Sequence, residues 1–224
     1  MEGFEKLIKK ELLVTSSETE YDQLEPWIQW ASVHTGKTFK EHQVFRLGDF
    51  VNSSSEQFFE RVEKAGFSVG AISPMNASNR LKKTAYFIPD PWTQTLCDNS
   101  FFSKIITDAL VQAVNDNSKS KLSFKTILSL GLAFVFFVKP IRYISMVKYL
   151  FKIFGKPWRK ALFLDMFLYE IHKTLFKRKN PNFSTLFLNA GAHIQHHYFF
   201  NSPFVTSPQL KNPTWYIKKK MILY

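Results

Sequence analysis

The sequence predicts an α/β fold in which a central, mostly parallel sheet is flanked by helices. Two segments with helical character, 57–65 and 160–178, are each followed by a short apolar stretch with strand character, 67–72 and 183–188. Gly66 ends the first helix, because glycine readily adopts the left-handed conformation found just past a helix. Each strand then leads into a polar loop. Helix-then-strand units of this kind are typical of α/β architecture.

The residues before the first unit predict short helices. An amphipathic pattern indicates one helix over residues 4–13. Pro26 fits the first turn of a second helix, and Gly36 fits just past its end. Ser53 and Glu56 have the spacing of a capping box, so we expect them to begin the helix of the first unit.

Between the two units the chain changes from extended to helical character. Residues 84–92 predict a loop or an edge strand, because Pro89 and Pro91 cannot donate hydrogen bonds inside a sheet. Residues 100–178 are almost wholly helical in character. Their longest apolar run, 127–138, covers about 12 residues, whereas a membrane-spanning helix needs roughly 20. This run therefore predicts a buried or interfacial helix.

Three regions follow from this order. We expect residues 1–99 to form the N-terminal part of the α/β core and residues 100–178 to form a helical insertion or cap. Residues 179–224 would return to the core and carry a histidine-rich loop. Hydrophobic residues make up 45% of the chain and charged residues 21%, which is the composition of a globular protein.

The net charge of +12 is unevenly distributed and gathers in a basic helical stretch. Such a stretch could lie on an anionic membrane through about residues 127–160, or it could be a solvated basic face. We expect no nucleic-acid partner. The 24 phenylalanines predict an apolar surface that another subunit or partner could cover. The basic residues of the stretch are Lys139, Arg142, Lys148, Lys152, Lys156, Arg159 and Lys160.

The chain has a single cysteine, Cys97, so no intrachain disulfide can form. The first residues lack the pattern of a signal peptide. Both features favour a cytoplasmic or peripheral membrane location.

The densest chemical signal is the run His193-Ile194-Gln195-His196-His197, which holds three of the six histidines. Imidazole nitrogen binds zinc and other transition metals near neutral pH. If the segment is helical, His193 shares a face with His196 and with His197, and two of these rings could hold one divalent ion. The alternative is a polar loop whose histidines form hydrogen bonds with the backbone.

Two other segments could contact phosphate. Asn76 and Asn79 follow the first strand and could donate hydrogen bonds to a substrate oxyanion, although asparagine also suits turn geometry. Residues 31–38 have the spacing of a relaxed phosphate-binding loop with Lys37 as its lysine. Such a loop follows a strand, whereas the residues before this one have helical character. Nucleotide binding is therefore the weaker hypothesis.

A series of short motifs resembles the alkaline phosphatase superfamily, closest to its type I phosphodiesterase/nucleotide pyrophosphatase and sulfatase-like branches. The resemblance covers most of the chain. It implies an alkaline-phosphatase-like core, two metal ions that are usually zinc, and hydrolysis of phosphate or sulfate esters through a covalent intermediate. The motifs are Pro26-Trp27-Ile28-Gln29-Trp30, Thr35-Gly36 with His42, Ser73-Pro74-Met75-Asn76, Phe87-Ile88-Pro89-Asp90-Pro91-Trp92 and Ala192-His193-Ile194-Gln195-His196.

Carried onto this sequence, the resemblance places a family histidine at His42 and the family nucleophile at Pro26, which has no nucleophilic side chain. Glu25, beside that position, could bind metal but is not the family nucleophile. Ser32 and Thr35 are substitutes within or after the predicted helix. The catalytic nucleophile therefore stays open at this point.

The same resemblance makes His196 the metal-binding histidine, with His193 and His197 as supporting ligands. Ala192 stands where the family has an aspartate, and His193 could replace that carboxylate. The family's early aspartate and its later Asp-His pair have no counterpart in this sequence. We therefore expect an incomplete core, a fragment that can lack activity by itself.

Two functions of different classes are consistent with these features. The first is a metal-dependent hydrolase or transferase acting on small-molecule or glycan esters of phosphate or sulfate. The second is a degenerate, non-catalytic family member that binds glycan, lipid or a protein partner, and the missing nucleophile favours it. The sequence leaves open whether the ester is a phosphate or a sulfate.

Overall fold

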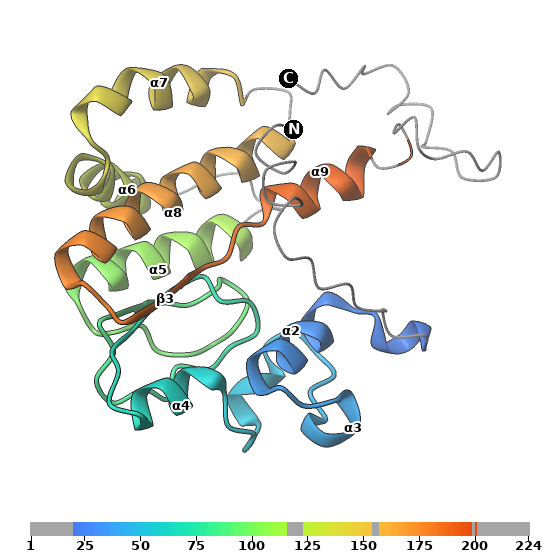
Figure 1. Ribbon diagram of the computed structural model, residues 1–224. Helices are drawn as coiled ribbons and strands as arrows, with labels where there is room; N and C mark the ends of the chain where they lie inside the picture. Colours follow the sequence, from blue (N-terminus) through green and yellow to red (C-terminus); the bar gives the residue numbers. More distant parts are fainter. Residues whose placement is uncertain (1–19, 116–122, 154–156, 199, 201–224) are drawn as a thin grey trace, which may run out of the picture.

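The computed structural model describes residues 20–115, 123–153, 157–198 and 200, which form an α/β fold (Figure 1). Three short strands pair in parallel, and helices cover both faces of the sheet they form. The predicted α/β class with a parallel sheet is therefore confirmed. The strands lie in the order β2-β1-β3, with β1 at Val69–Ile72, β2 at Tyr86–Ile88 and β3 at Phe183–Leu186.

The central strand, β1, is buried along its whole length. A continuous apolar run is typical of a parallel strand that is covered on both faces. Its register places Ala71 opposite Phe87 of β2 and Thr185 of β3. The segment predicted as a loop or an edge is the edge strand β2, which ends one residue before Pro89.

One face of the sheet is covered by α4 (Phe58–Lys64). Beside α4 lie α2 (Pro26–Thr35) and α3 (Phe39–His42), with short 3-10 turns at η1 (Tyr21–Gln23) and η2 (Asp49–Asn52). As predicted, Pro26 stands in the first turn of α2 and Gly36 follows its end with a φ of 68°. The buried core of this face consists of Phe59, Val69, Ala71, Ala77 and Phe87.

The capping box expected at Ser53 and Glu56 is wrong. The box lies four residues later, at Gln57 and Glu60, where the Glu60 carboxylate accepts a hydrogen bond from the Gln57 backbone N–H at 2.9 Å. The Gln57 side chain also exchanges hydrogen bonds with the backbone of Ser78, after β1. This contact, across 21 residues, fixes Gln57 rather than Ser53 at the helix start.

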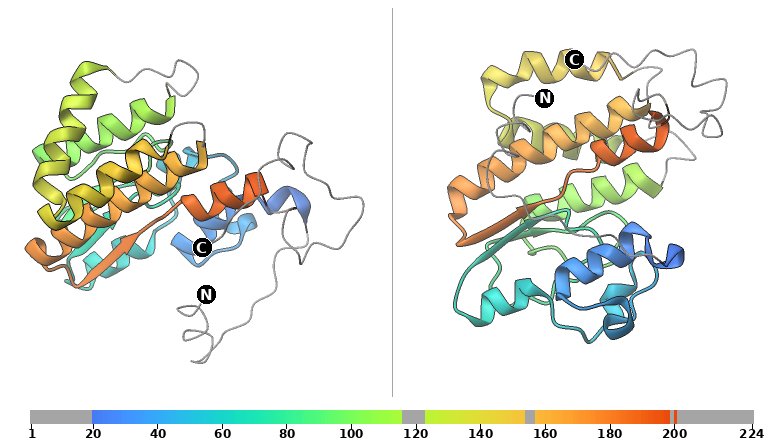
Figure 2. Two further views of the ribbon diagram at one scale, coloured as in Figure 1. Left: turned by 90° about the horizontal axis from the view of Figure 1, so that it is seen from above. Right: turned by 45° about the vertical axis from the view of Figure 1, so that its right-hand side comes forward.

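Four helices cover the other face of the sheet (Figure 2). α5 contacts β2 and α8 contacts β1 and β3, while α6 packs against α5 and α8, and α7 packs against α8. Their buried side chains form one core with Ile72, Tyr86 and Ile88 of the sheet. The helical region therefore packs directly on the sheet. Its helices are α5 (Phe101–Asn115), α6 (Phe124–Phe137), α7 (Pro140–Phe151) and α8 (Pro157–Lys179).

The histidine-rich segment forms a helix, α9 (Ala190–Tyr198), which follows β3 and lies beside α8. The helix expected over 4–13 lies outside the described residues. Among the helices that the structure describes, none has both the length and the apolarity to cross a bilayer.

We expect the protein to lose stability as the pH falls below about 6.5, the ordinary pKa of histidine. Burial lowers the pKa of His34, and it also lowers the pKa of His42 and of His172. The unfolded chain therefore takes up protons before the folded chain does. Stability is complete above about pH 6.5 and is lost as the pH falls towards the lowered folded values.

Urea unfolding on both sides of that pH measures the effect. His34 is the best test because it is 3% exposed, and one such group contributes at most about 1.4 kcal/mol per pH unit. His34→Gln keeps a donor for its hydrogen-bond partner, the Met75 carbonyl oxygen, and should flatten the pH dependence. A slope that His34→Gln leaves unchanged would contradict the prediction.

Candidate functional site at the carboxyl edge of the sheet

The segments that follow the three strands leave the sheet at the same edge, because the strands are parallel. Helix α2 lies against this edge. The side-chain nitrogen of Asn76, after β1, donates a hydrogen bond to the Trp27 carbonyl oxygen of α2 at 2.9 Å. The rings of Trp30 and Phe187, after β3, meet edge to face with 5.1 Å between their centroids. Ligands of open α/β sheets commonly bind at such an edge.

Asn76 and Asp90 join the first two of these segments, and both are fully buried. The Asp90 carboxylate accepts the backbone N–H of Asn76 at 2.9 Å. It also accepts the backbone N–H groups of Trp92 and Thr93 and the Thr93 hydroxyl, at 2.6 to 2.9 Å. Burial raises the pKa of Asp90, and these hydrogen bonds oppose that rise.

The side chain of Asn76, predicted to contact substrate, is already engaged within the protein. Its oxygen accepts the Gly48 backbone N–H at 2.9 Å, and its nitrogen donates to the carbonyl oxygens of Trp27 and Arg46. Its φ of 51° lies in the left-handed region, which asparagine tolerates better than most residues. In this conformation Asn76 holds the edge of the sheet together.

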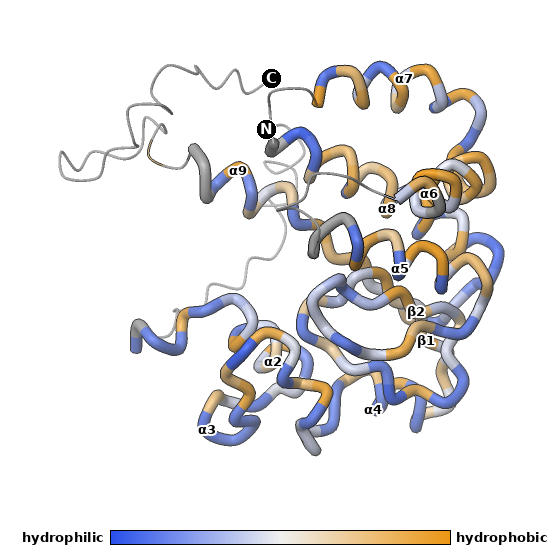
Figure 3. The backbone as a smooth tube through the Cα atoms, turned by 180° about the vertical axis from the view of Figure 1, so that it is seen from behind, coloured by the Kyte–Doolittle hydropathy of each residue, from blue (hydrophilic) through white to orange (hydrophobic). Residues whose placement is uncertain are grey.

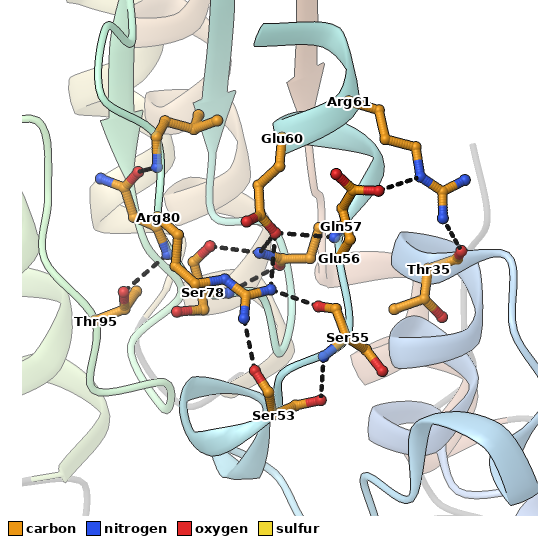
Figure 4. A network of polar contacts seen from close by, with 12 residues as sticks. Thr35, Ser53, Ser55, Glu56, Gln57, Glu60, Arg61, Ser78, Arg80 and Thr95 are labelled. Atoms are coloured by element: carbon orange, nitrogen blue, oxygen red, sulfur yellow. Dashed lines mark hydrogen bonds and ion pairs between the residues drawn. The ribbon is translucent and has the colours of Figure 1, made fainter. Parts of the chain in front are cut away.

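Asn79 has a comparable role on the neighbouring turn. Its backbone N–H donates to the Thr95 hydroxyl at 2.8 Å, and its side-chain nitrogen donates to the Leu96 carbonyl oxygen at 2.9 Å. The adjacent Arg80 donates to the carbonyl oxygens of Ser53 and Ser55 and pairs with Glu60 of α4 (Figure 4). This network ties the loop after β1 to α4.

The hydroxyl groups of Ser32 and Thr35 on α2 are also engaged. The Thr35 hydroxyl donates to the Ala31 carbonyl oxygen at 2.8 Å, inside its own helix. Ser32 Oγ lies 3.0 Å from His42 Nε2, while His42 Nδ1 accepts the backbone N–H of Val44 at 3.0 Å. Since Nδ1 is an acceptor, neutral His42 carries its proton on Nε2 and donates it to Ser32. His42 is therefore not placed to remove a proton from Ser32.

Two further sequence candidates gain no supporting geometry. Glu25 is exposed and precedes α2 without a side-chain capping bond. The 31–38 segment contains the second half of α2, and Gly36 caps that helix by donating its N–H to the Ser32 carbonyl oxygen at 2.8 Å. A phosphate-binding loop instead follows a strand and keeps its N–H groups free for phosphate.

Helix α9 follows β3 and carries the three histidines at the spacing that the sequence allowed. His193 is partly buried, and it is separated from His196 and His197 by three and four residues of one helix. The side chains of His196 and His197 lie outside the described part of the structure. Among the described side chains, no group of three His, Cys, Asp or Glu is placed to hold a metal ion.

Asp165 of α8 anchors the start of α9. Its carboxylate oxygens accept the backbone N–H groups of Asn189 at 3.1 Å and Ala190 at 2.7 Å. These N–H groups have no partner within α9, and the positive end of the helix dipole favours a carboxylate there. Burial raises the pKa of Asp165, and the two N–H groups and nearby His193 oppose the rise. The pair of hydrogen bonds fixes where α9 leaves the sheet.

Asp165→Ala should destabilise the protein by about 1 to 2 kcal/mol, as expected for loss of a helix cap with a favourable dipole interaction. It should also raise hydrogen exchange in α9 more than elsewhere. Asp165→Asn keeps one acceptor oxygen, so its stability and its exchange in α9 should lie between those of the Ala variant and the original protein. Hydrogen exchange read by mass spectrometry, with chemical unfolding, measures both. Equal exchange in α9 of the Ala variant and the original protein would contradict this role.

Sequence reasoning missed Asp90 and Asp165 as organisers of this edge. Asp90 stands two residues after a strand, and Asp165 is the one acid in the apolar run 161–168. An acid in such a run signals a buried carboxylate with a specific partner. No protein-family model, no curated protein and no solved structure matches the chain significantly, so its geometry carries the interpretation.

Proposed function

We propose that the chain is part of a metal-dependent hydrolase of phosphate or sulfate esters, with the alkaline-phosphatase-like core that its motifs resemble. The observation that supports this proposal most is the position of α9. The helix carries three histidines, starts at Ala190 shortly after β3 ends at Leu186, and is held at its start by Asp165 on the sheet edge where Asn76 also lies.

The donor set of α9 fits part of a metal centre. Two imidazoles three or four residues apart on a helix can bind one zinc-type ion, and a catalytic zinc site usually has three protein ligands. Two neighbouring residues in the sequence, Asn189 and Ala192, have no carboxylate that could serve as a further metal ligand. Among the described side chains, no further His, Cys, Asp or Glu completes a three-ligand site. When bound, such an ion polarises an ester oxygen or a water molecule.

The remaining residues have structural roles at the carboxyl edge of the sheet. Asp165 sets the direction of α9, and Asp90 with Asn76 fixes the loops of β1 and β2 against α2. Ser32 and Thr35 are committed to internal hydrogen bonds and are not assigned as nucleophiles.

Zinc binding tests the proposal. Isothermal titration should show a single zinc ion bound, and His196→Ala or His193→Ala should weaken that binding by more than about tenfold. Gln195→Ala, an exposed neighbour on the same helix, is the matched control and should bind as before. Aryl phosphate, phosphodiester and aryl sulfate substrates then report hydrolysis. Zinc binding that both histidine variants leave unchanged would overturn the proposal.

A non-catalytic binding function is the second candidate, and the engaged hydroxyls of α2 favour it. Without Ser32 or Thr35 as nucleophile, the edge could hold an ester without cleaving it. In that case zinc would bind through His196, and inorganic phosphate or sulfate would compete for the loaded site. None of the three substrate types would be hydrolysed. Turnover of any of them that His196→Ala abolishes would exclude this candidate.

A further inference from the structure

Helices α6 and α7 expose a large apolar surface. Among the described residues, six exposed large hydrophobic side chains lie on α6 and five on α7. The most exposed are Ile141, at 87%, and Phe124, at 82%. Figure 3 shows that hydrophobic positions dominate α6 and alternate with hydrophilic ones along α7. Contiguous exposed apolar surface of this kind usually marks an interaction site.

On α6 the exposed side chains follow helical spacing and form one stripe along the whole helix, while Ala133 and Phe137 on its other side are buried in the core. With Phe101 and Phe102 of α5, the stripe lines an open apolar groove of about 760 Å³. The stripe consists of Phe124, Ile127, Leu128, Leu132, Val135 and Phe136.

On α7 apolar and basic side chains share the outward face. Ile141, Ile144 and Phe151 are 70% to 87% exposed, and their spacing places them on one side of the helix with Lys148. Met146 points to the opposite side and is fully buried. Lys148 can therefore reach past the apolar side chains beside it.

The charge along α6 and α7 themselves has a single sign. The sequence contains no Asp or Glu from residue 117 to residue 164, while it contains ten Lys or Arg there. Lys139 joins α6 to α7 and, like Lys148 and Lys152, is exposed. The nearest carboxylate that the structure pairs with these helices is buried Glu170, which lies 3.6 Å from Arg142. Two helices that combine an apolar face with cations and carry no acid match a surface that is anionic outside and apolar beneath.

We propose that α6 and α7 form a docking face for a bilayer that contains anionic phospholipids. The apolar side chains of the stripe and of α7 enter the boundary between headgroups and acyl chains, as the apolar face of an interfacial helix does. Lys139, Lys148 and Lys152 contact the anionic headgroups. A second copy of the chain fits this face poorly, because it would place the same cations opposite one another without an acid between them.

Vesicle co-sedimentation tests the proposal. The full chain should bind vesicles of phosphatidylcholine mixed with phosphatidylserine, and should bind pure phosphatidylcholine vesicles much less. The triple variant Lys139→Gln, Lys148→Gln, Lys152→Gln should bind the anionic vesicles roughly 100-fold more weakly, at about fivefold for each charge. High salt should weaken binding of the original chain, because it screens the charges.

Matched variants test whether vesicle binding depends on this face or only on the total charge and hydrophobicity of the chain. Lys40→Gln, Lys82→Gln and Lys83→Gln together remove three exposed lysines elsewhere and should change binding less than twofold. Ile141→Ser, Ile144→Ser and Phe151→Ser together should abolish binding, whereas Leu96→Ser, an exposed site outside these helices, should not. Circular dichroism confirms that each variant is folded.

Equal binding to both kinds of vesicle, or binding that the triple lysine variant retains, would overturn the proposal. So would the absence of any vesicle binding. A concentration-dependent dimer in lipid-free solution that Ile144→Ser disperses would instead make the face an interface between copies. Each of these outcomes leaves zinc binding at α9 untouched, so the two proposals succeed or fail separately.

Discussion

Asp90→Ala is expected to lower the free energy of unfolding by about 3 to 5 kcal/mol. The substitution removes a fully buried carboxylate that accepts four hydrogen bonds. It leaves the buried backbone N–H groups of Asn76 and Thr93, and the partly buried one of Trp92, without an acceptor, and each fully buried group costs about 1 to 3 kcal/mol. The two loops would also lose their connection at the sheet edge.

Urea unfolding followed by circular dichroism measures this loss, and the melting temperature should fall by roughly 10 °C. Asp22→Ala removes an exposed aspartate and is the control, with an expected change below about 0.5 kcal/mol. Asp90→Asn should be intermediate because it keeps one acceptor oxygen. A loss below about 1 kcal/mol for Asp90→Ala would show that the carboxylate does not hold the loops.

Gly70→Ala is expected to cost about 2 to 3 kcal/mol through overpacking of the central strand. Gly70 lies in β1 directly opposite Tyr86 of β2. A Cβ atom at position 70 would stand 2.6 Å from the Tyr86 ring carbon Cε1 and 2.7 Å from its hydroxyl oxygen. The Tyr86 ring is 1% exposed, so it has little room to move away. Burial also raises the pKa of Tyr86 to about 12, as expected for an enclosed phenol.

A second glycine provides the control. Gly131 lies in α6, and a Cβ there would meet no atom within 4 Å. Gly131→Ala should therefore stabilise the protein by about 0.5 to 1 kcal/mol, because alanine is the better helix former. A double-mutant cycle of Gly70→Ala with Tyr86→Ala isolates the contact, and the cost of Gly70→Ala should nearly vanish without the Tyr86 ring. If Gly70→Ala costs as much in the Tyr86→Ala background, the loss of stability comes from the backbone of β1 and not from the contact with the ring.

Short-range patterns predicted the elements whose ends depend on nearby residues. Pro26 and Gly36 mark α2 through backbone geometry alone, and both predictions are confirmed. The same rules failed at Ser53, because the side chain of Gln57 is held by Ser78, and no local pattern contains that contact. Where two residues could both cap a helix, a contact with a distant part of the chain determines which of them does.

The candidate site was predictable in its location but not in its internal roles. The sequence placed Asn76 and the histidine run after strands, and parallel pairing brings the two segments to one sheet edge. It did not indicate that the Asn76 side chain is hydrogen-bonded to backbone groups of Trp27, Arg46 and Gly48. Nor did it indicate that His42 presents a donor, rather than an acceptor, to Ser32.

By itself, the sequence determined the α/β class, the helical region between 100 and 178 and the spacing of the three histidines, because periodicity and turn residues act over a few positions. Only the tertiary structure decided that α9 is a helix anchored by Asp165, since its cap comes from 24 residues earlier in the chain. It also decided that one face of the apolar run of α6 stays exposed while Ala133 and Phe137 are buried. Burial depends on which elements meet, and a one-dimensional pattern of hydrophobic residues does not contain that information.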